Sequence, residues 1–218
     1  MRAIAILVAL GACGGNGDGI EEAKRQAALQ DKDKGESAKP AAKVTPPVPS
    51  GVHLKCDQVI DAAAFGKALN EVEAMTIRDN TANEAEAAAS CSLVRGGKRP
   101  NEAEQKAIAK AKGRIGVIPG DDTCNITLKC WTFEDENRLR ARCKERKWRD
   151  DDTMGNYACV QVVATGEDDV NFFRFVDPDT KCLFEIRGGP GMTDNDYIRT
   201  CAKTARDSIG PTQIAVKP

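Results

Sequence analysis

The chain has 218 residues, 41% of them hydrophobic and 30% charged, with 32 basic side chains against 33 acidic ones. These proportions suit one globular domain or two small ones, and they exclude collagen, a coiled-coil rod and a polytopic membrane protein. The formal net charge of -1 also argues against a protein that neutralises nucleic acid, so we expect no nucleic-acid partner.

The chain begins with a basic residue and a short apolar run, in the sequence MRAIAILVALGAC. A membrane-spanning helix needs about 20 apolar residues, so residues 1–12 are too short to span and are typical of a secretory signal peptide. The end of this run, Leu10-Gly11-Ala12-Cys13, resembles the lipobox of bacterial lipoproteins. That resemblance implies cleavage before Cys13, lipidation of its sulfur, and an exported protein whose lipid anchor makes the membrane a partner.

The residue after the cysteine bears on the membrane that holds the anchor. It is Gly14 rather than Asp, and by the lipoprotein resemblance this favours the outer membrane over the inner one. The alternative is an ordinary signal peptide cut after Ala12, with Cys13 left as a plain thiol. From Cys13 to residue 51 the chain is rich in glycine, proline and balanced charges and has no aromatic residue, which predicts a lipidated cysteine followed by a flexible tether.

Residues 52–218 have the composition of a folded domain. Apolar residues at helical spacing predict a helix over residues 57–70, and residues 72–79 and 89–95 are typical of two short strands. A second helix is expected over residues 101–112, because Pro100 suits its start and Gly113 its end.

A series of β-rich runs follows residue 122. The runs 124–133 and 138–148, joined by the polar turn EDEN, predict a hairpin, and three further strands are expected within residues 156–187, with a turn at residues 177–180. A last helix is expected over residues 196–209. The predicted class is therefore α+β, a disulfide-stabilised antiparallel meander of about five strands with helices packed on one face.

A faint internal echo links CSLVRGG, which starts at Cys91, with CLFEIRGG, which starts at Cys182. Each run precedes a predicted helix. The echo suggests a duplicated strand-helix unit, with halves at residues 52–118 and 119–218 that share one sheet. Chance similarity of short strands is the alternative.

Nine cysteines are an awkward number for an exported chain, but removing Cys13 as lipid-bearing leaves eight, enough for four disulfides. Alternation along the predicted hairpin places Cys130 and Cys143 on one face, so we expect them to pair. Position favours Cys56 with Cys91 and Cys182 with Cys201, which leaves Cys124 with Cys159. This is one of 105 connectivities that eight cysteines allow.

The predicted second strand of the hairpin carries a row of like charges on its other face. The row consists of Arg138, Arg140, Arg142, Lys144 and Arg146, with Lys129 and Trp131 on the neighbouring strand. Such a row is a candidate surface for a partner that bears phosphate or carboxylate groups. The alternative is a solvated face whose arginines are compensated across the sheet by the many acids of residues 150–196.

Metal binding and catalysis have little support in the sequence. There is no Cys-x-x-Cys pair, and the one histidine, His53, is far in sequence from the closest cysteine pair, Cys124 and Cys130, so we expect no metal and no cofactor. Asp150, Asp152 and Gly155 have part of the spacing of a calcium loop, but Met154 occupies a ligand position, and a solvated turn fits better. We identify no catalytic residue and do not expect an enzyme.

These observations predict a lipid-anchored cell-envelope protein that acts as a binding module. The expected partner is an anionic envelope polymer, lipid headgroups or another envelope protein. The alternative function is inhibition of an exported hydrolase by an inserted loop such as residues 188–193.

Overall fold

The computed structural model describes residues 46–113, 115–165, 168–189 and 195–216. The predicted signal peptide, Cys13 and all but the last residues of the predicted tether lie outside the described residues, as does most of the loop at residues 188–193. None of the helices in the described segments has both the length and the apolar character needed to cross a membrane.

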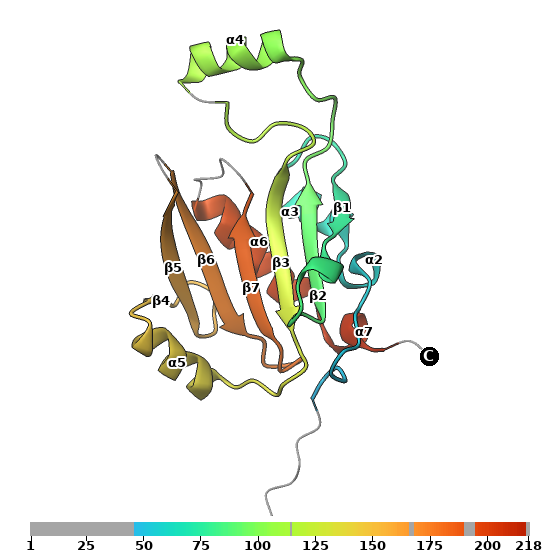
Figure 1. Cartoon of the computed structure of the whole chain (residues 1–218), viewed down its shortest axis with the longest axis vertical. Helices are drawn as coiled ribbons and strands as arrows, with labels where there is room; N and C mark the ends of the chain where they lie inside the picture. The colour runs from blue at the N-terminus through green and yellow to red at the C-terminus, as the bar shows by residue number, and fades with distance from the viewer. Residues whose placement is uncertain (1–45, 114, 166–167, 190–194, 217–218) are drawn as a thin grey trace, which may run out of the picture. The chain divides into compact units, whose positions relative to one another are not determined.

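The described residues form one antiparallel sheet in the order β1-β2-β3-β7-β6-β5-β4 (Figure 1). The chain therefore runs from β3 to the far edge of the sheet and returns, strand by strand, until β7 pairs with β3. The predicted α+β class is confirmed, with seven strands where about five were expected in the meander. The strands are β1 (Thr76–Asp79), β2 (Ala89–Val94), β3 (Asp122–Lys129), β4 (Arg149–Asp151), β5 (Ala158–Thr165), β6 (Asp168–Val176) and β7 (Leu183–Gly188).

The main core lies between the sheet and α6 (Asn195–Ser208), which packs against β3, β6 and β7 (Figure 1). Alternate residues of the strands point into this core, among them Ile126, Phe173 and Phe184, each at most 1% exposed. Three shorter helices complete this layer: α2 (Cys56–Val59), α3 (Ala62–Ala68) and α7 (Pro211–Ile214). Complete burial of one large apolar side chain stabilises the fold by about 1.5–3 kcal/mol.

The expected helix over residues 57–70 is interrupted. Ile60 has extended backbone angles, and Asp61 then caps α3 by accepting hydrogen bonds from the backbone N–H groups of Ala63 and Ala64. The helix expected over residues 101–112 is confirmed as α4 (Glu102–Lys112), with a capping box between Asn101 and Glu104 and a left-handed Gly113 at its end. The chain between β1 and β2 also forms the short 3-10 helix η1 (Thr81–Asn83).

The prediction of a second hairpin strand over residues 138–148 is wrong, because most of these residues belong to the helix α5 (Glu136–Glu145). Leu139 and Cys143 fit the period of two that predicted a strand, but they are also one helical turn apart, and both are buried. Asp135 caps the helix by accepting from the Arg138 N–H (2.9 Å). Ala141, which a strand would also have buried, is exposed.

Four disulfides join the eight cysteines of the described domain. Of the expected pairs only Cys56–Cys91 is confirmed, and the other three pairs expected, Cys130–Cys143, Cys182–Cys201 and Cys124–Cys159, are wrong. Because β3 pairs with β7 and not with the segment after it, Cys130 meets the residue that precedes β7. The remaining bridges are Cys130–Cys182, Cys124–Cys201 and Cys143–Cys159.

The two segments of the internal echo become β2 and β7, which lie on either side of β3. The helices that follow them differ in packing. Helix α6 is packed on the sheet, whereas α4 has no buried residue. Duplication stays a hypothesis.

Candidate functional site

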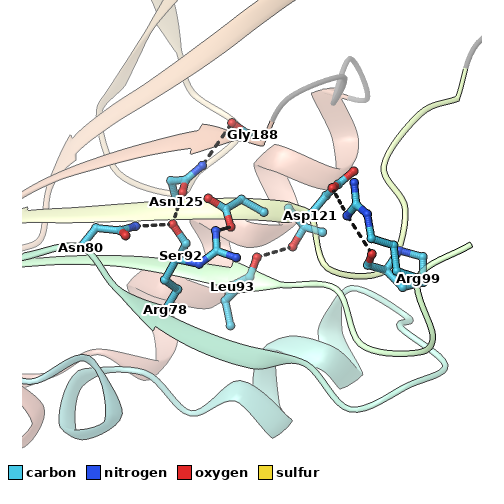
Figure 2. A network of polar contacts seen from close by, with 11 residues as sticks. Arg78, Asn80, Ser92, Leu93, Arg99, Asp121, Asn125 and Gly188 are labelled. Atoms are coloured by element: carbon cyan, nitrogen blue, oxygen red, sulfur yellow. Dashed lines mark hydrogen bonds and ion pairs between the residues drawn. The ribbon is translucent and has the colours of Figure 1, made fainter. Parts of the chain in front are cut away.

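The sheet face opposite α6 is polar over the strands β1, β2, β3 and β7. Figure 2 shows a row of hydrogen bonds across it: Asn80 Nδ2 donates to Ser92 Oγ (2.7 Å), Ser92 Oγ donates to Asn125, and Asn125 Nδ2 donates to the Gly188 carbonyl (3.4 Å). Beside this row, Arg78 pairs with Asp122. These polar groups satisfy one another, so this part of the face stabilises strand register rather than presenting groups to a ligand.

Helix α5 covers the other part of that face and forms a second, smaller core. Leu139 and Cys143 of the helix pack with Tyr157, Cys159, Val176 and Leu183 from the sheet. The disulfide Cys143–Cys159 fixes the helix to β5. The polar part of this sheet face therefore meets the strongly basic helix α5 along one line.

A groove of about 520 Å³ lies along this line. Its lining includes Trp131 and Trp148, which are the chain's two tryptophans. Its volume falls within the range of about 300–1,000 Å³ typical of ligand sites. The apolar walls are completed by Leu139 and Leu183, and the charged lining residues are Lys129, Arg142, Arg146, Arg174, Glu86, Glu134 and Glu185.

Most charges inside the groove are paired with one another. Arg174 Nε donates to Glu185 Oε1 (2.8 Å), and Lys129 Nζ lies 3.3 Å from the other oxygen of the same carboxylate. Arg142 donates to Glu134 (2.7 Å), whose side chain is 11% exposed. Burial alone would raise the pKa of Glu185, but the hydrogen bond and positive charge of Arg174, together with Lys129, outweigh burial and lower that pKa.

Aromatic rings hold three guanidinium groups in fixed orientations. The Cζ atom of Arg174 lies 4.0 Å and that of Arg146 5.2 Å from the centre of the Trp148 ring, and Arg140 lies 3.8 Å from the centre of the Tyr157 ring. Such stacking keeps the planar forks ordered before an anion arrives, so less side-chain entropy is lost on binding.

Trp131 is anchored differently. Its Nε1 donates to the Val52 carbonyl (2.9 Å), and its ring makes an edge contact with exposed His53 at 5.3 Å between ring centres. The tryptophan thus joins the start of the folded domain to the wall of the groove.

The prediction that the row of basic side chains lies on one face is wrong. Successive members of the row are about 200° apart around a helix of 3.6 residues per turn. The groove brings together Lys129, Trp131, Arg142 and Arg146, while Arg138, Arg140 and Lys144 lie outside its lining.

The expected compensation of the row by acids of residues 150–196 is also wrong for the three arginines of α5. Arg138, Arg140 and Arg142 pair with Asp135, Glu136 and Glu134, which come just before the helix or in its first turn. Asp151 instead pairs with Arg199, and Asp150 accepts from the Tyr157 hydroxyl (2.8 Å).

Arg174, Glu185 and Glu134 were not among the predicted site residues. For Arg174 and Glu185 a signal exists in the sequence, because each is a charged residue between two large apolar ones in a β-rich run. An Arg and a Glu inside such strands must share a face with a partner or lie in a cleft. For Glu134 we find no comparable signal.

A cluster of uncompensated positive charge lies at the C-terminal end of α5 and in the residues that follow it. Lys144, Arg146, Lys147 and Arg149 have no ion-pair partner among the residues that the structure describes, and they surround half-buried Trp148. We call residues 144–149 the Trp148 surface. Trp148 also lines two further hollows, one with Lys144 and Lys147 and the other with Arg146 and Arg149.

Within the described segments, no group of three or more His, Cys, Asp or Glu side chains is arranged to hold a metal ion. Comparison with protein-family models, curated proteins and solved structures found no match to this chain. The features of this chain that bear on its function are therefore the groove and the Trp148 surface.

Proposed function

We propose that the protein is a lipid-anchored envelope protein whose folded domain binds an anionic envelope component through the Trp148 surface and the adjoining groove. The observation that carries the proposal is the contrast between two sets of cations. Those of the first turns of α5 have acidic partners, whereas those around Trp148 have none among the described residues.

An unpaired cation beside a hollow favours an anionic ligand for electrostatic reasons. Like charges on neighbouring residues repel one another, and a bound oxyanion relieves that repulsion. Arg146 is already stacked on Trp148, so its guanidinium offers a planar fork with two parallel donors to a carboxylate or phosphate. Arg and Trp are also the residue types that contribute most to binding energy at interfaces.

Location supports the same partner class. The lipobox-like sequence that ends at Cys13 predicts an anchor in a bacterial membrane, and the composition of residues 13–51 predicts a tether between that anchor and the folded domain. The surroundings of such a domain contain anionic polymers and lipids. Enzyme activity is not part of the proposal.

The test compares the retention of purified full-length variants on isolated envelope fractions at low salt. All variants carry Cys13→Ala, so that no lipid anchor contributes to retention. We expect Arg146→Ser with Arg149→Ser to weaken retention about tenfold, because each lost exposed ion pair is worth up to about 1 kcal/mol and 1.4 kcal/mol is a factor of ten.

The matched control is Arg78→Ser with Arg138→Ser. It also removes two exposed arginines, but both of these have acidic partners within the protein, at 2.6 Å and 3.6 Å. The control should keep its retention within about twofold, because a surface pair contributes little. Equal losses in the two double variants would show that net charge, and not the Trp148 surface, causes retention.

A further inference from the structure

Three hollows meet at Trp148. The first is the groove of about 520 Å³, which extends toward Trp131. The second, of about 360 Å³, is lined by Arg146, Lys147 and Arg149, and the third, of about 520 Å³, by Lys144, Lys147 and Tyr157 among others. The hollows share Trp148 and, in pairs, Arg146 or Lys147, so they lie next to one another, and we call this series of adjacent hollows the path.

Each hollow combines cations with an aromatic or apolar wall. In the groove the half-buried rings of Trp131 and Trp148 supply this wall, since Leu139 and Leu183 are only 1% and 4% exposed, and in the other hollows Trp148 supplies it. A bare phosphate group is much smaller than these volumes and would leave the apolar walls without contact. A sugar ring has apolar C–H faces that pack on such walls, and a carboxylate on the ring fits the arginine fork.

The path ends at acidic residues. A fourth hollow shares Arg140, Asp150 and Tyr157 with the third and adds Asp151 and Asp152, so its acidic residues outnumber its one arginine. An anionic chain that follows the path is repelled at this point, since like charges at close range cost binding energy. The ligand is thus limited to the part of the path between Trp131 and Tyr157.

We infer that the ligand is a linear acidic polysaccharide whose successive carboxylated sugar rings occupy the three hollows around Trp148. This inference rests on the proposed function and names the ligand class of that same surface. A ligand that fills connected hollows gains affinity with length until the hollows are full, because each added ring binds intramolecularly. Rings beyond about the third find no further hollow with excess positive charge.

The experiment measures binding of galacturonate oligomers to the full-length Cys13→Ala protein by calorimetry. We expect the trimer to bind at least about tenfold more tightly than the monomer, and the hexamer to add less than about threefold. The double variant Lys144→Ser with Lys147→Ser should weaken binding of the trimer several-fold. It should leave binding of the monomer unchanged, because a single ring binds in the groove, which neither lysine lines. The control is the double variant Arg78→Ser with Arg138→Ser. It should bind each oligomer as tightly as the protein without these two substitutions.

Two results would overturn the inference and leave the proposed function standing. Equal affinity for monomer and trimer would show that one hollow suffices, and equal affinity for polyphosphate of the same charge would show that the sugar ring is not recognised. The proposed function itself fails if no anionic probe binds and envelope retention does not change on replacing Arg146 and Arg149. A neutral galactose oligomer that binds as tightly as the acidic one would overturn both the inference and the proposed function, because the cations would then have no role.

Discussion

Glu185 is the acidic residue to which the cations at the floor of the groove are bound. It lies on β7 between Phe184 and Ile186, which point into the main core, and its own side chain is 22% exposed on the opposite face. Arg174, which is 13% exposed, donates to it and also lies over Trp148. Loss of the carboxylate charge would leave Arg174 and Lys129 without an ion-pair partner, with only the hydrogen bond from Arg174 to Gln161 (3.1 Å) remaining, which is more costly than losing one surface ion pair.

We therefore predict that Glu185→Gln lowers the free energy of unfolding by about 2 kcal/mol at pH 7. The control Glu136→Gln, which breaks an ion pair with Arg140 in which both side chains are 52% exposed, should cost less than about 0.5 kcal/mol. Urea denaturation measures both. Equal effects of the two substitutions would contradict the role given to Glu185.

The same carboxylate predicts a dependence of stability on pH. Its pKa is lowered in the folded protein, so its contribution is present above the ordinary value of about 4.3 and is lost as the pH falls through the folded value. The pKa values of Asp79 and Asp151 are also lowered, since hydrogen bonds, from Thr81 and Thr153 in particular, outweigh burial. Stability should therefore fall from pH 5 to pH 3, and less steeply in Glu185→Gln, because glutamine does not titrate.

Helix α5 carries the groove wall and leads directly into the Trp148 surface. It has 10 residues, a length at which an isolated helix is marginal in water. Its attachment to the sheet depends on two buried side chains, Leu139 and Cys143, and on the disulfide to Cys159. The position of the proposed binding surface therefore depends on this one small core.

Replacing Cys143 and Cys159 by alanine should cost about 3 kcal/mol, the value expected for a closed loop of 16 residues. Backbone amides of α5 should then exchange with solvent faster than those of β3 and β7, and envelope retention should weaken. Hydrogen exchange and retention measure the two effects.

The matched control for this prediction is replacement of Cys56 and Cys91 by alanine. That bridge closes a loop of 35 residues, so its loss should cost a similar amount, about 4 kcal/mol. Because this bridge joins α2 to β2, retention by the molecules that remain folded should not change. Loss of retention in both variants would indicate that global stability, rather than the position of α5, determines binding.

For the whole molecule, strand β3 is the element that joins distant parts of the chain. It pairs with β2 on one side and with β7 on the other, and Cys124 connects it to α6. Cys130, which follows the strand, connects to the residue before β7. These bridges close loops of 77 and 52 residues, so they remove more unfolded-state entropy than the shorter ones.

Mass spectrometry of natively purified protein tests both the proposed lipid anchor and the disulfide pairing. We expect a chain that begins at a lipid-modified Cys13 and contains no free thiol. Peptide mapping without reduction should recover Cys124 linked to Cys201 and Cys130 linked to Cys182. An unmodified N-terminus would refute the proposed lipid anchor, and bridges between neighbouring cysteines, such as Cys124 with Cys130, would refute the sheet order.

The sequence by itself determined the features that depend on nearby residues. Helix α4 begins and ends where Pro100 and Gly113 predicted, and its start is fixed by a capping box between Asn101 and Glu104. The turn at residues 177–180 forms because the Asp177 carboxylate accepts from the N–H and hydroxyl groups of Thr180. Such signals act over a few residues, so they hold whatever the rest of the chain does.

Only the tertiary structure decided whether residues 138–147 form a strand or a helix, which strands pair, and which cysteines meet. Leu139 and Cys143 satisfy both the strand and the helix period, so their pattern alone does not choose between the two. The choice depends on β7, which begins 40 residues after Cys143 and occupies the edge of β3 that the predicted hairpin required. The groove has the same origin, because its Lys129, Arg142, Arg174 and Glu185 come from four different elements that only this sheet order brings together.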